Sequence, residues 1–404
     1  MTDDPATLAL CMDARMLAEA SGTGVATYAR GLRAAQILLG DARLLTDRFV
    51  GRMGERRSRV EQVRRWLGTR RDVSVDTWAD ADTIVGRDIF RRAKVHFDRH
   101  GTVMQVAPPS GPPGIMHWTY PVPIRLCGWR NVYTVHDVIP LTAPDLSPIK
   151  SARHRCLLSA ILEGADAIAT VSASARAEIV TALGLDPARV VDCGQAVLPG
   201  PAGRVEVGRV DVAGLEPGGY FLFCGSIEPR KNLVRLAEAW RASGVATPLV
   251  IVGSDGWRAE TILPLLDAAG VIRLPYLPAA DLRALQAGAR AVLFPTLAEG
   301  FGLPIVEAMA LGTPVLTSHA GATAEVAGGA ALLVDPTDVA GIADAIRRLD
   351  GDEALRAGLA RAGLARSAAY SPTVFTDRLA ALYATVLVSN GPPPYRRVAH
   401  DGKS

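Results

Sequence analysis

The sequence has no long apolar segment: no run approaches the roughly 18 to 20 residues that a membrane-spanning helix needs. Its N-terminus, MTDDPATLAL, is acidic and lacks the apolar core of a secretory signal peptide. We therefore expect a protein of the cytoplasm, either free or held peripherally on the inner face of the plasma membrane.

An excess of charge of one sign is also lacking, because 44 Lys and Arg residues stand against 41 Asp and Glu residues for a net charge of +3. This balance argues against a general nucleic-acid-binding protein. Cysteine is scarce and forms no CxxC pair, and most of the five lie in apolar, strand-like segments. That pattern indicates buried free thiols in a reducing compartment. The five are Cys11, Cys127, Cys156, Cys193 and Cys224.

A chain of 404 residues is too long for one ordinary core, so two domains are expected. The second half alternates short apolar strands with amphipathic helices, which is the pattern of a doubly wound parallel α/β domain. A stretch rich in Pro and Gly separates it from the first half. The predicted boundaries are 1–200 for the first domain, 201–217 for a linker, 218–372 for the second domain, 373–390 for a last amphipathic helix and 391–404 for a mobile tail.

The stretch from Ala291 to Ala310, AVLFPTLAEGFGLPIVEAMA, combines an apolar run, a turn and a helix-like segment. This order predicts a buried parallel strand, a tight loop at its carboxyl end and a helix N-terminus that faces the same crevice. Glu299 and Glu307 bracket the turn, eight residues apart. A carboxylate accepts two hydrogen bonds from a vicinal diol, so the pair suits sugar or ribose hydroxyls. Two carboxylates are also typical of glycoside hydrolysis.

A second glycine turn, GSIEPRKN, follows the first strand expected in the second half. Arg230 and Lys231 stand there at the start of a helix, where cations oppose the helix dipole and are mildly unfavourable as structure alone. A bound anion reverses this effect, because the Arg fork chelates phosphate oxygens and Lys adds a point charge. We therefore favour a diphosphate site over a solvated charge pair, with the Ser226 hydroxyl as a further donor. Diphosphate and hydroxyl sites together describe a nucleotide sugar in a cleft between two domains.

Two strands expected in the first half end in polar or aromatic residues. The strand over 131–135 runs into His136 and Asp137, where open α/β sheets bind ligands. A shorter one ends in His117 and Trp118. We favour His136 as a group aimed at the reacting centre over a histidine satisfied by a local hydrogen bond. We place His117, Trp118 and Asp137 on the acceptor side.

Near the N-terminus, Gly22 and Gly24 belong to a broken GxGxxG that lacks its third glycine and does not directly follow a strand. As a dinucleotide fingerprint it is weak, which argues against a dehydrogenase. The two glycines still allow close backbone approach to a phosphate at a helix N-terminus. Asp80 and Asp82 have the spacing of a metal-binding pair, but their context favours helix capping, and no metal is expected.

An arginine-rich stretch over 48–71 places apolar residues on one helical stripe and basic residues on the other face. Two interpretations stand side by side: a solvated helix packed on its domain, and a membrane-surface helix attracted to anionic lipid. The residues that would meet the membrane are Arg56, Arg57, Arg64, Arg65 and Trp66.

Six segments match one known family. They read GTGVATYARGL, HDVIPL, TVSASARAEI, GSIEPRKNL, FPTLAEGFGLPIVEAMALGTPVLTS and ALLVDPTD, and they span nearly the whole chain. With them the chain resembles the retaining family 4 glycosyltransferases of the GT-B fold, especially the bacterial mannosyltransferase-like group of polysaccharide and exopolysaccharide biosynthesis. The resemblance implies two Rossmann-like doubly wound domains that face each other across a cleft, the first for the acceptor and the second for the nucleotide sugar. It also implies a C-terminal helix that crosses back to the first domain.

The resemblance also assigns roles. It implies that Glu307 holds the nucleotide ribose, that Glu299 holds the donor sugar hydroxyls, and that His136 lies over the anomeric centre. Arg230 and Lys231 would neutralise the diphosphate in place of a metal, so no metal and no cofactor besides the donor is required. We take His136, Arg230, Lys231 and Glu299 as the catalytic set.

Further donor contacts follow from the same match. Gly22 or Gly24 would approach the diphosphate from the first domain. The backbone N–H groups of Phe301, Gly302 and Leu303 would contact the sugar. Many members carry Arg where Ser226 stands here, and Arg230 would take over that charge. The remaining donor-binding residues are Phe301, Gly302 and Leu303 for the sugar, and Tyr276 and Leu277 for the base.

The expected reaction is therefore transfer of a sugar, with retention, from a nucleotide diphosphate to a lipid-linked oligosaccharide or polysaccharide precursor. Mannose from GDP-mannose is the first choice by resemblance, with UDP- or dTDP-sugars as alternatives. A nucleotide-sugar 2-epimerase on the same fold is a second enzyme class, and a non-catalytic, membrane-recruited protein on a decayed fold is a third interpretation. The intact set of charged residues argues against decay.

Overall fold

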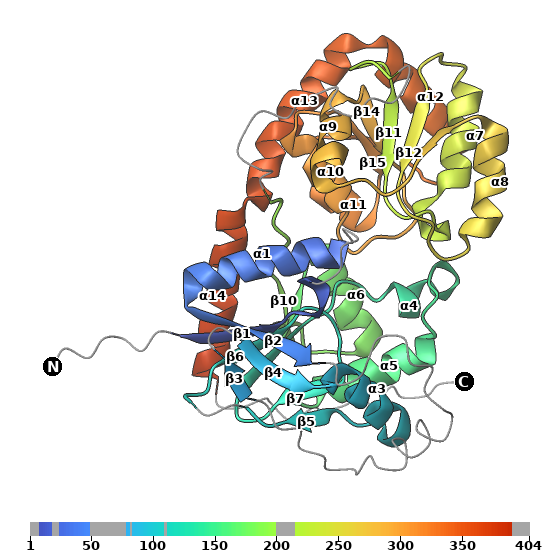
Figure 1. Cartoon of the computed structure of the whole chain (residues 1–404). Coiled ribbons are helices and arrows are strands. Elements are labelled where there is room, and N and C mark those ends of the chain that lie inside the picture. Colours follow the sequence, from blue (N-terminus) through green and yellow to red (C-terminus); the bar gives the residue numbers. More distant parts are fainter. Residues whose placement is uncertain are drawn as a thin grey trace.

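The computed structural model describes residues 8–17, 24–48, 78–80, 83–108, 111–198 and 215–389. Two α/β domains stand one above the other, and the chain passes from the lower to the upper and back (Figure 1). Each domain is a twisted, mainly parallel sheet with helices on both faces, so the expected fold is confirmed. No helix among these residues is both long and apolar enough to cross a membrane.

In the part of the chain that the structure describes, the N-terminal sheet has eight strands in the order β10-β9-β8-β6-β1-β2-β4-β3. All neighbours pair in parallel except β3, which runs antiparallel to β4. The order reverses at β1, which lies between β2 and β6, and ligands bind at such a switch point in open α/β sheets. The strands are β1 (Ala9–Asp13), β2 (Asp41–Arg48), β3 (Trp78–Asp80), β4 (Thr83–Arg87), β6 (Ile115–Trp118), β8 (Arg130–Thr134), β9 (Ala167–Thr170) and β10 (Val190–Asp192), with a separate pair β5 (Met104–Val106) and β7 (Ile124–Leu126).

The C-terminal sheet has six parallel strands in the order β13-β12-β11-β14-β15-β16. Its switch point lies between β11 and β14, so the loops after these two strands meet at one edge. Both strands are fully buried and apolar, as parallel strands covered on two faces should be. The strands are β11 (Phe221–Cys224), β12 (Leu249–Val252), β13 (Ile272–Leu274), β14 (Ala291–Phe294), β15 (Val315–Ser318) and β16 (Leu332–Val334).

The helices cover both faces of the sheets. In the N-terminal part they are α1 (Gly24–Leu39), α3 (Ile89–His100), α4 (Ile139–Thr142), α5 (Ser151–Leu162) and α6 (Ala173–Leu183). In the C-terminal part they are α7 (Leu233–Ser243), α8 (Ala259–Ala269), α9 (Ala279–Gly288), α10 (Leu303–Ala310), α11 (Gly321–Ala327), α12 (Val339–Gly351), α13 (Glu353–Ser367) and α14 (Pro372–Val388). Short 3₁₀ turns span Arg15–Leu17, Pro144–Leu146, Pro187–Arg189, Pro229–Lys231 and Ala368–Tyr370.

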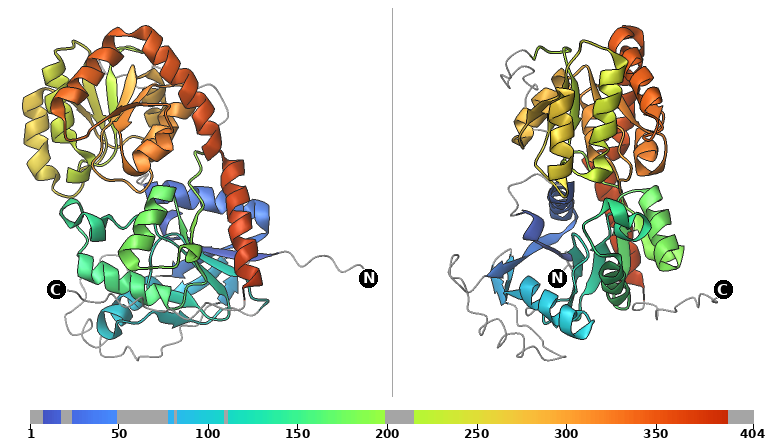
Figure 2. Two further views of the ribbon diagram at one scale, coloured as in Figure 1. Left: turned by 180° about the vertical axis from the view of Figure 1, so that it is seen from behind. Right: turned by 90° about the vertical axis from the view of Figure 1, so that its right-hand side faces the viewer.

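The last helix joins the two domains. Figure 2 shows α14, in red, running from the C-terminal domain down along the N-terminal domain, where it packs against α1. The hydroxyl of Tyr383 on α14 accepts a hydrogen bond from Gln36 of α1 at 3.1 Å. Phe375 and Tyr28 form an edge-to-face pair with ring centroids 5.8 Å apart. The predicted crossover helix is therefore confirmed.

A second set of contacts links the domains at the N-terminus of α6. Ser172 caps α6 as its sequence position predicts, accepting from the Ala175 N–H. Its hydroxyl also donates to the Gly300 carbonyl of the C-terminal domain at 2.7 Å. The carboxylate of Glu325, on α11, accepts from the backbone N–H groups of Ala173 and Ser174 at 2.8 and 2.7 Å. These bonds hold the carboxyl edges of the two sheets against each other.

Several expectations for the first half need correction. The apolar stretch over 189–197 predicts a strand, but only Val190–Asp192 forms one, β10. The segments that form β2, β3, β4 and α3 were not predicted. Of the cysteines, Cys11, Cys193 and Cys224 are buried free thiols as expected, but Cys156 is exposed and Cys127 half-buried. The predicted linker lies mostly, and the predicted tail entirely, outside the described residues.

Candidate active site

The loop after β11 supplies the cations of the site. Gly225 has φ 149°, a region that favours glycine, and it lets the chain turn directly from the strand. Pro229 then opens a 3₁₀ turn that ends in Arg230 and Lys231. The Lys231 side chain runs back past Gly225 and places its ammonium 5.0 Å from the centre of the Phe294 ring. Local structure thus directs both cations to the switch point of the sheet.

Glu299, in the loop after β14, bonds both cations. Its Oε2 accepts from Arg230 Nη1 at 2.8 Å, and its Oε1 accepts from Lys231 Nζ at 2.6 Å. Glu228 accepts from Arg230 Nη2 at 2.7 Å and from the Ser226 hydroxyl at 2.9 Å. Two cations and two carboxylates therefore form one neutral, largely buried cluster. The structure brings together the residues predicted for the diphosphate site. Glu299, which was expected to bind the sugar hydroxyls, is bonded to Arg230 and Lys231.

The electrostatics of this cluster favour the charged forms of Glu299 and Arg230. Burial by itself would raise the pKa of Glu299, but Lys231 and Arg230 outweigh it and hold that pKa below its usual range. Burial likewise opposes the charge of Arg230, yet Glu299 and Glu228 keep the pKa of its guanidinium above normal. Arg donates through five N–H groups and Lys through three, so donors remain for an anion.

The loop between β14 and α10, which carries Glu299, also carries backbone N–H groups without a hydrogen-bond partner among the described residues. Gly302, with φ 100°, ends the loop in a conformation that glycine tolerates best. Phe301 turns inward and packs edge-to-face on Tyr370, with ring centroids 5.3 Å apart. The amides of Phe301, Gly302 and Leu303 make no hydrogen bond with another residue in the described part of the chain. They stand at a helix N-terminus, where such groups bind oxygen ligands.

Glu307 lies one helical turn further along α10. Burial raises the pKa of its carboxyl group to about 7, against weaker opposing effects from Gln286, Arg283 and Arg30. Gln286 donates to its Oε2 over a long 3.4 Å. Arg30 belongs to α1, so the field at Glu307 includes a charge from the other domain. A carboxylate this poorly satisfied suits a ligand that donates two hydrogen bonds.

His136 faces this site from the N-terminal domain. Its Nε2 lies 2.9 Å from the Thr119 carbonyl oxygen, which can only accept, so Nε2 carries the proton. Burial lowers the pKa of His136, and the ring is therefore neutral at pH 7 with its lone pair on Nδ1. The edge of Tyr28 packs on it with ring centroids 4.9 Å apart. The structure thus gives His136 a fixed orientation.

Gly300 brings the two halves of the site into contact. A Cβ at Gly300 would lie 2.4 Å from the His136 carbonyl oxygen and 3.1 Å from the Asp137 Cβ. Only glycine permits this approach without movement of the backbone. Asp137 itself accepts from the Ile139 N–H and is close enough to raise the pKa of Arg230.

Sequence reasoning missed Asp13, the last residue of β1. Its carboxylate is fully buried and accepts from the Thr119 N–H at 2.7 Å and from the Thr119 hydroxyl. Burial raises the pKa of Asp13 to about 6. Because Thr119 in turn accepts from His136, Asp13 anchors the segment that orients the histidine. The signal that was available is a single carboxylate ending the apolar strand ALCMD.

Two predicted acceptor residues are wrong. His117 is fully buried, with Nδ1 2.8 Å from the Tyr383 hydroxyl and Nε2 2.9 Å from Thr134 Oγ1. Trp118 is equally buried, and its indole N–H donates to Asn131 at 3.1 Å. Both side chains are satisfied inside the N-terminal domain, so neither reaches an acceptor.

The other predicted residues stay predictions. Gly24 opens α1, and Tyr276 and Leu277 follow β13 at the carboxyl edge of the second sheet. Gly22, Asp82, Arg56, Arg57, Arg64, Arg65 and Trp66 lie outside the described residues. Among the residues that the structure describes, no group of three or more His, Cys, Asp and Glu side chains could hold a metal.

Comparison with known proteins agrees with this geometry. Residues 218–352, from the first strand of the second sheet to the end of α12, match the family described as glycosyl transferases group 1. O-antigen chain mannosyltransferase B of Escherichia coli is 35% identical over 256 residues, which cover 60% of this chain and 67% of that protein. The chain belongs to the group 1 glycosyltransferases. This group 1 glycosyltransferase is also 30% identical to the serotype-specific mannosyltransferase WbdA of E. coli over 272 residues, although the match spans only 33% of that longer protein.

Solved structures confirm the fold of this glycosyltransferase. Sucrose-phosphate synthase from Thermosynechococcus elongatus superposes with a TM-score of 0.66 at 19% identity, over 94% of this chain and 99% of that one. Anabaena HepE in complex with UDP and glucose gives 0.64 at 14% identity, over 94% and 100%. The two-domain GT-B architecture is thus shared over nearly the whole length, whereas identity this low carries no information on substrate.

Proposed function

We propose that this glycosyltransferase moves a mannosyl residue, with retention of configuration, from GDP-mannose to a lipid-linked oligosaccharide or polysaccharide precursor. The observation that carries the proposal is the convergence of Arg230, Lys231 and Glu299 on the loop that packs against His136. Mannose is favoured because curated relatives from E. coli, and the O-antigen chain mannosyltransferase RfbU of Salmonella typhimurium, are mannosyltransferases by name.

The charge cluster supports departure of a nucleoside diphosphate. In the free protein Glu299 and Glu228 together neutralise the two cations, which are therefore held in place without a bound anion. An arriving diphosphate would use the donors that remain on Arg230 and Lys231, and would leave Glu299 to accept from the sugar hydroxyls. Groups that are already oriented then stabilise the charge that develops on the leaving group. Such electrostatic stabilisation of the transition state is usually the largest single contribution to catalysis.

The neutral His136 suits a mechanism without a protein base at the anomeric carbon. Its proton is committed to Thr119, and no carboxylate bonds its ring among the described residues. We infer that a diphosphate oxygen takes the acceptor's proton while the acceptor attacks from the same face, which retains the configuration. The protein then contributes position and charge stabilisation, with Arg230 and Lys231 in the place of a metal.

The donor is tested by measuring thermal stability with GDP, UDP and dTDP, because a ligand of the folded state stabilises it by mass action. The proposal expects the largest shift with GDP. Turnover of GDP-mannose with a lipid-linked saccharide should then release GDP and give a glycoside of retained configuration. A larger shift with UDP would contradict the mannosyl donor, and an epimerised nucleotide sugar formed from donor alone would contradict transfer itself.

We further propose that the enzyme works peripherally at the cytoplasmic face of the membrane. The support is the arginine-rich stretch over 48–71, which continues directly from β2 at the carboxyl edge of the N-terminal sheet. Removing the charges of Arg56, Arg57, Arg64 and Arg65 should abolish co-sedimentation with vesicles that contain anionic phosphatidylglycerol, whereas neutral phosphatidylcholine vesicles should bind neither protein. Equal pelleting of both proteins with anionic vesicles would refute this role.

A further inference from the structure

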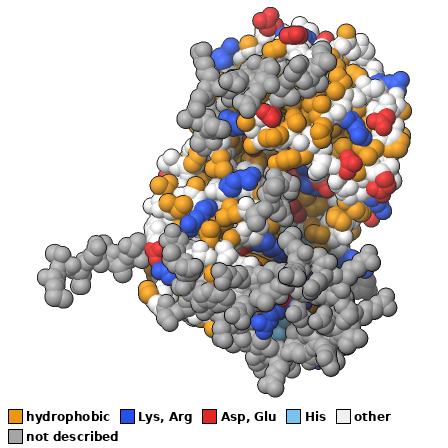
Figure 3. Space-filling view, in the orientation of Figure 1, with side chains coloured by type: hydrophobic (Ala, Val, Ile, Leu, Met, Phe, Trp, Pro, Cys, Tyr) orange, Lys and Arg blue, Asp and Glu red, His pale blue; other side chains and the backbone are white. Residues whose placement is uncertain are grey.

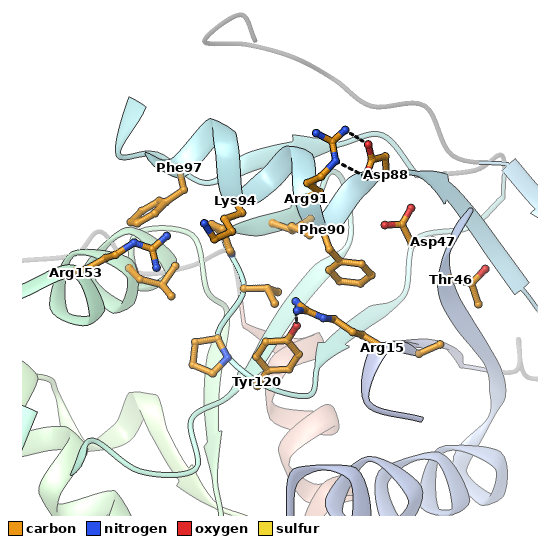
Figure 4. Close-up of a pocket in the computed structure, with 16 residues that line it drawn as sticks. Arg15, Thr46, Asp47, Asp88, Phe90, Arg91, Lys94, Phe97, Tyr120 and Arg153 are labelled. Atoms are coloured by element: carbon orange, nitrogen blue, oxygen red, sulfur yellow. Dashed lines mark hydrogen bonds and ion pairs between the residues drawn. The ribbon is translucent and has the colours of Figure 1, made fainter. Parts of the chain in front are cut away.

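A cavity of about 700 Å³ opens at the carboxyl edge of the N-terminal sheet. It lies where the chain leaves β1, β2 and β6, beneath the first turns of α3 (Figure 4). Its size is that of a small-molecule site. None of the residues predicted for the catalytic, donor or acceptor site lines it. Its apolar wall consists of Phe90, Phe97, Tyr120, Pro121, Val122, Pro123, Ile124 and Leu157.

Arg15 is the distinctive charge of this cavity. Its guanidinium lies 5.6 Å from the ring centre of Phe90 and 5.4 Å from that of Tyr120, and it donates to the Tyr120 hydroxyl. Figure 4 shows these three side chains converging in the cavity. Arg15 forms no ion pair with any carboxylate in the part of the chain that the structure describes. A guanidinium held by aromatic faces keeps its fork available for an anion.

The other cations of the lining have carboxylate partners. Arg91, Lys94 and Arg153 line the cavity with Arg15, against the carboxylates of Asp47 and Asp88, and both Lys94 and Arg153 pair with the adjacent Asp98. Asp88 is already bonded by Arg91. Asp47 accepts from the Ile89 N–H, so it is engaged by the backbone of α3. The excess charge is therefore positive, beside a continuous apolar wall, and this combination fits a ligand that is anionic at one end and apolar at the other.

A short link joins the cavity to the reaction centre. Tyr120 directly follows Thr119, whose carbonyl accepts from His136 and whose N–H is held by Asp13. Ala14 and Arg15 directly follow Asp13. The cavity thus borders the segment that orients His136, on the domain opposite the donor cations.

We propose that this cavity binds the phosphate group of the acceptor, with Arg15 chelating the phosphate oxygens and the aromatic and proline wall contacting the group esterified to it. This inference rests on the proposed function and specifies the acceptor as a phosphate ester. Two sources share that chemistry: a polyprenyl phosphate, whose apolar part would lie on the wall, and a sugar phosphate, whose ring would stack on Phe90 or Tyr120.

The test is calorimetric titration of the full-length enzyme with farnesyl phosphate in one arm and mannose 1-phosphate in the other. Saturating GDP is present in both arms, so that the donor cations are occupied. Arg15→Gln should weaken binding of the preferred probe at least roughly tenfold, because charge-assisted bonds to phosphate are about twice as strong as neutral ones. The matched control is Arg43→Gln, since Arg43 is paired with Asp41 outside the cavity and should leave affinity unchanged.

A second variant guards against a folding defect. Arg15→Lys keeps the charge and loses the fork, so its affinity should fall between those of wild type and Arg15→Gln. Each variant should keep the wild-type melting temperature and GDP affinity. Preference for farnesyl phosphate assigns the lipid source, and preference for mannose 1-phosphate assigns the sugar source.

Binding of neither probe to wild type, or equal binding to wild type and Arg15→Gln, would overturn the assignment. Failure of GDP to bind the wild-type enzyme would instead contradict the proposed function. Titration of the phosphate probes without GDP would then still report on the cavity, so the two failures are distinguishable.

Discussion

The carboxyl edges of the two sheets face each other, yet they are built in different ways. At the C-terminal edge Lys231 and Arg230 are bonded to Glu299 at 2.6 and 2.8 Å. At the N-terminal edge His136 is neutral and fixed by a backbone carbonyl, and Arg15 lies between two aromatic rings without an ion pair among the described residues. One edge therefore holds paired charges in fixed positions, and the other offers shape, aromatic surface and unbalanced charge.

The difference matches what the proposed function requires each edge to bind. A diphosphate is the same in every nucleotide sugar, so an edge of fixed cations suits any of them. Acceptors differ, and a cavity with an apolar wall can be shaped to one of them. The family match follows the same division, because it covers 218–352 in the C-terminal domain and leaves the N-terminal domain outside.

The largest effect is expected from removing one cation of the charge cluster at the C-terminal edge. Lys231→Ala should lower kcat/KM by roughly 10²–10³-fold, because it removes an oriented charge that meets the leaving diphosphate. Steady-state kinetics with the donor sugar measure it, and the melting temperature should change only slightly because Arg230 still pairs with Glu299. Arg347→Ala, which breaks an exposed ion pair on α12, is the control and should leave kcat/KM and the melting temperature unchanged. Near-normal turnover of Lys231→Ala would sink the diphosphate assignment.

The contact between the edges is tested at Gly300. An added methyl group would lie 2.4 Å from the His136 carbonyl, so Gly300→Ala should hold the domains apart or shift the loop. We expect kcat to fall by roughly 10- to 100-fold, since a displacement of about 1 Å near the chemistry costs up to 10²-fold. GDP affinity and melting temperature should stay close to wild type, because each domain keeps its core. Gly358→Ala on α13, where a methyl group meets nothing within 4 Å, is the matched control. Unchanged kcat would show that this contact is not made during turnover.

The smallest effect concerns the pH response of Glu307, a largely buried and poorly paired carboxylate on α10. Its pKa of about 7 lies above the ordinary 4.5, so the free folded protein holds this proton longer than the unfolded chain. Its contribution to stability is complete below about pH 4.5 and is lost as pH rises through about 7. Glu307→Gln should flatten that loss, by about 1 to 2 kcal/mol at pH 8 once partial exposure is allowed for.

The same proton should affect donor binding. Only the ionised Glu307 accepts both hydrogen bonds of a ribose diol, so wild-type affinity for GDP should weaken as pH falls below about 7. Glu307→Gln should bind GDP more weakly at pH 8 and with little pH dependence. Calorimetric titrations at pH 6, 7 and 8 measure both proteins. Parallel pH profiles would remove Glu307 from the ribose site.

The fold of the C-terminal half could be predicted closely from sequence. Its sequence predicts a strand over 291–294 and helices over 303–310 and 353–367, and these are the bounds of β14, α10 and α13. Most other elements differ from their predicted spans by a residue or two at the ends. Regular alternation of buried strands and short helices leaves few other interpretations. In the N-terminal half β2 and β4 were missed, since their sequences DARLLTDR and TIVGR mix polar and apolar residues without a clear period.

For the candidate site, the residue types could be predicted from the sequence, but the directions in which their side chains point could not. The strand IMHW buries all four side chains, so His117 and Trp118 point into the core although they precede a loop. Asp13 was not predicted, because a single carboxylate at the end of a strand does not form a recognisable motif. The cavity around Arg15 combines segments that are more than a hundred residues apart in sequence, and no local signal announces it.

By itself the sequence determined the two-domain architecture, the family, the presence of Arg230, Lys231 and Glu299 in loops that follow strands, and that of Glu307 in the next helix, because periodicity and turn residues act locally. The tertiary structure decided which charges neutralise each other, which histidine is buried and which faces the cleft, and where Arg15 meets its aromatic partners. Those outcomes depend on how β1, β6, β11 and β14 are ordered in their sheets and on the approach of Gly300 to His136. The order of the strands and the approach of Gly300 to His136 are both contacts between segments that are remote in sequence, and such contacts are set by the packing of the whole chain.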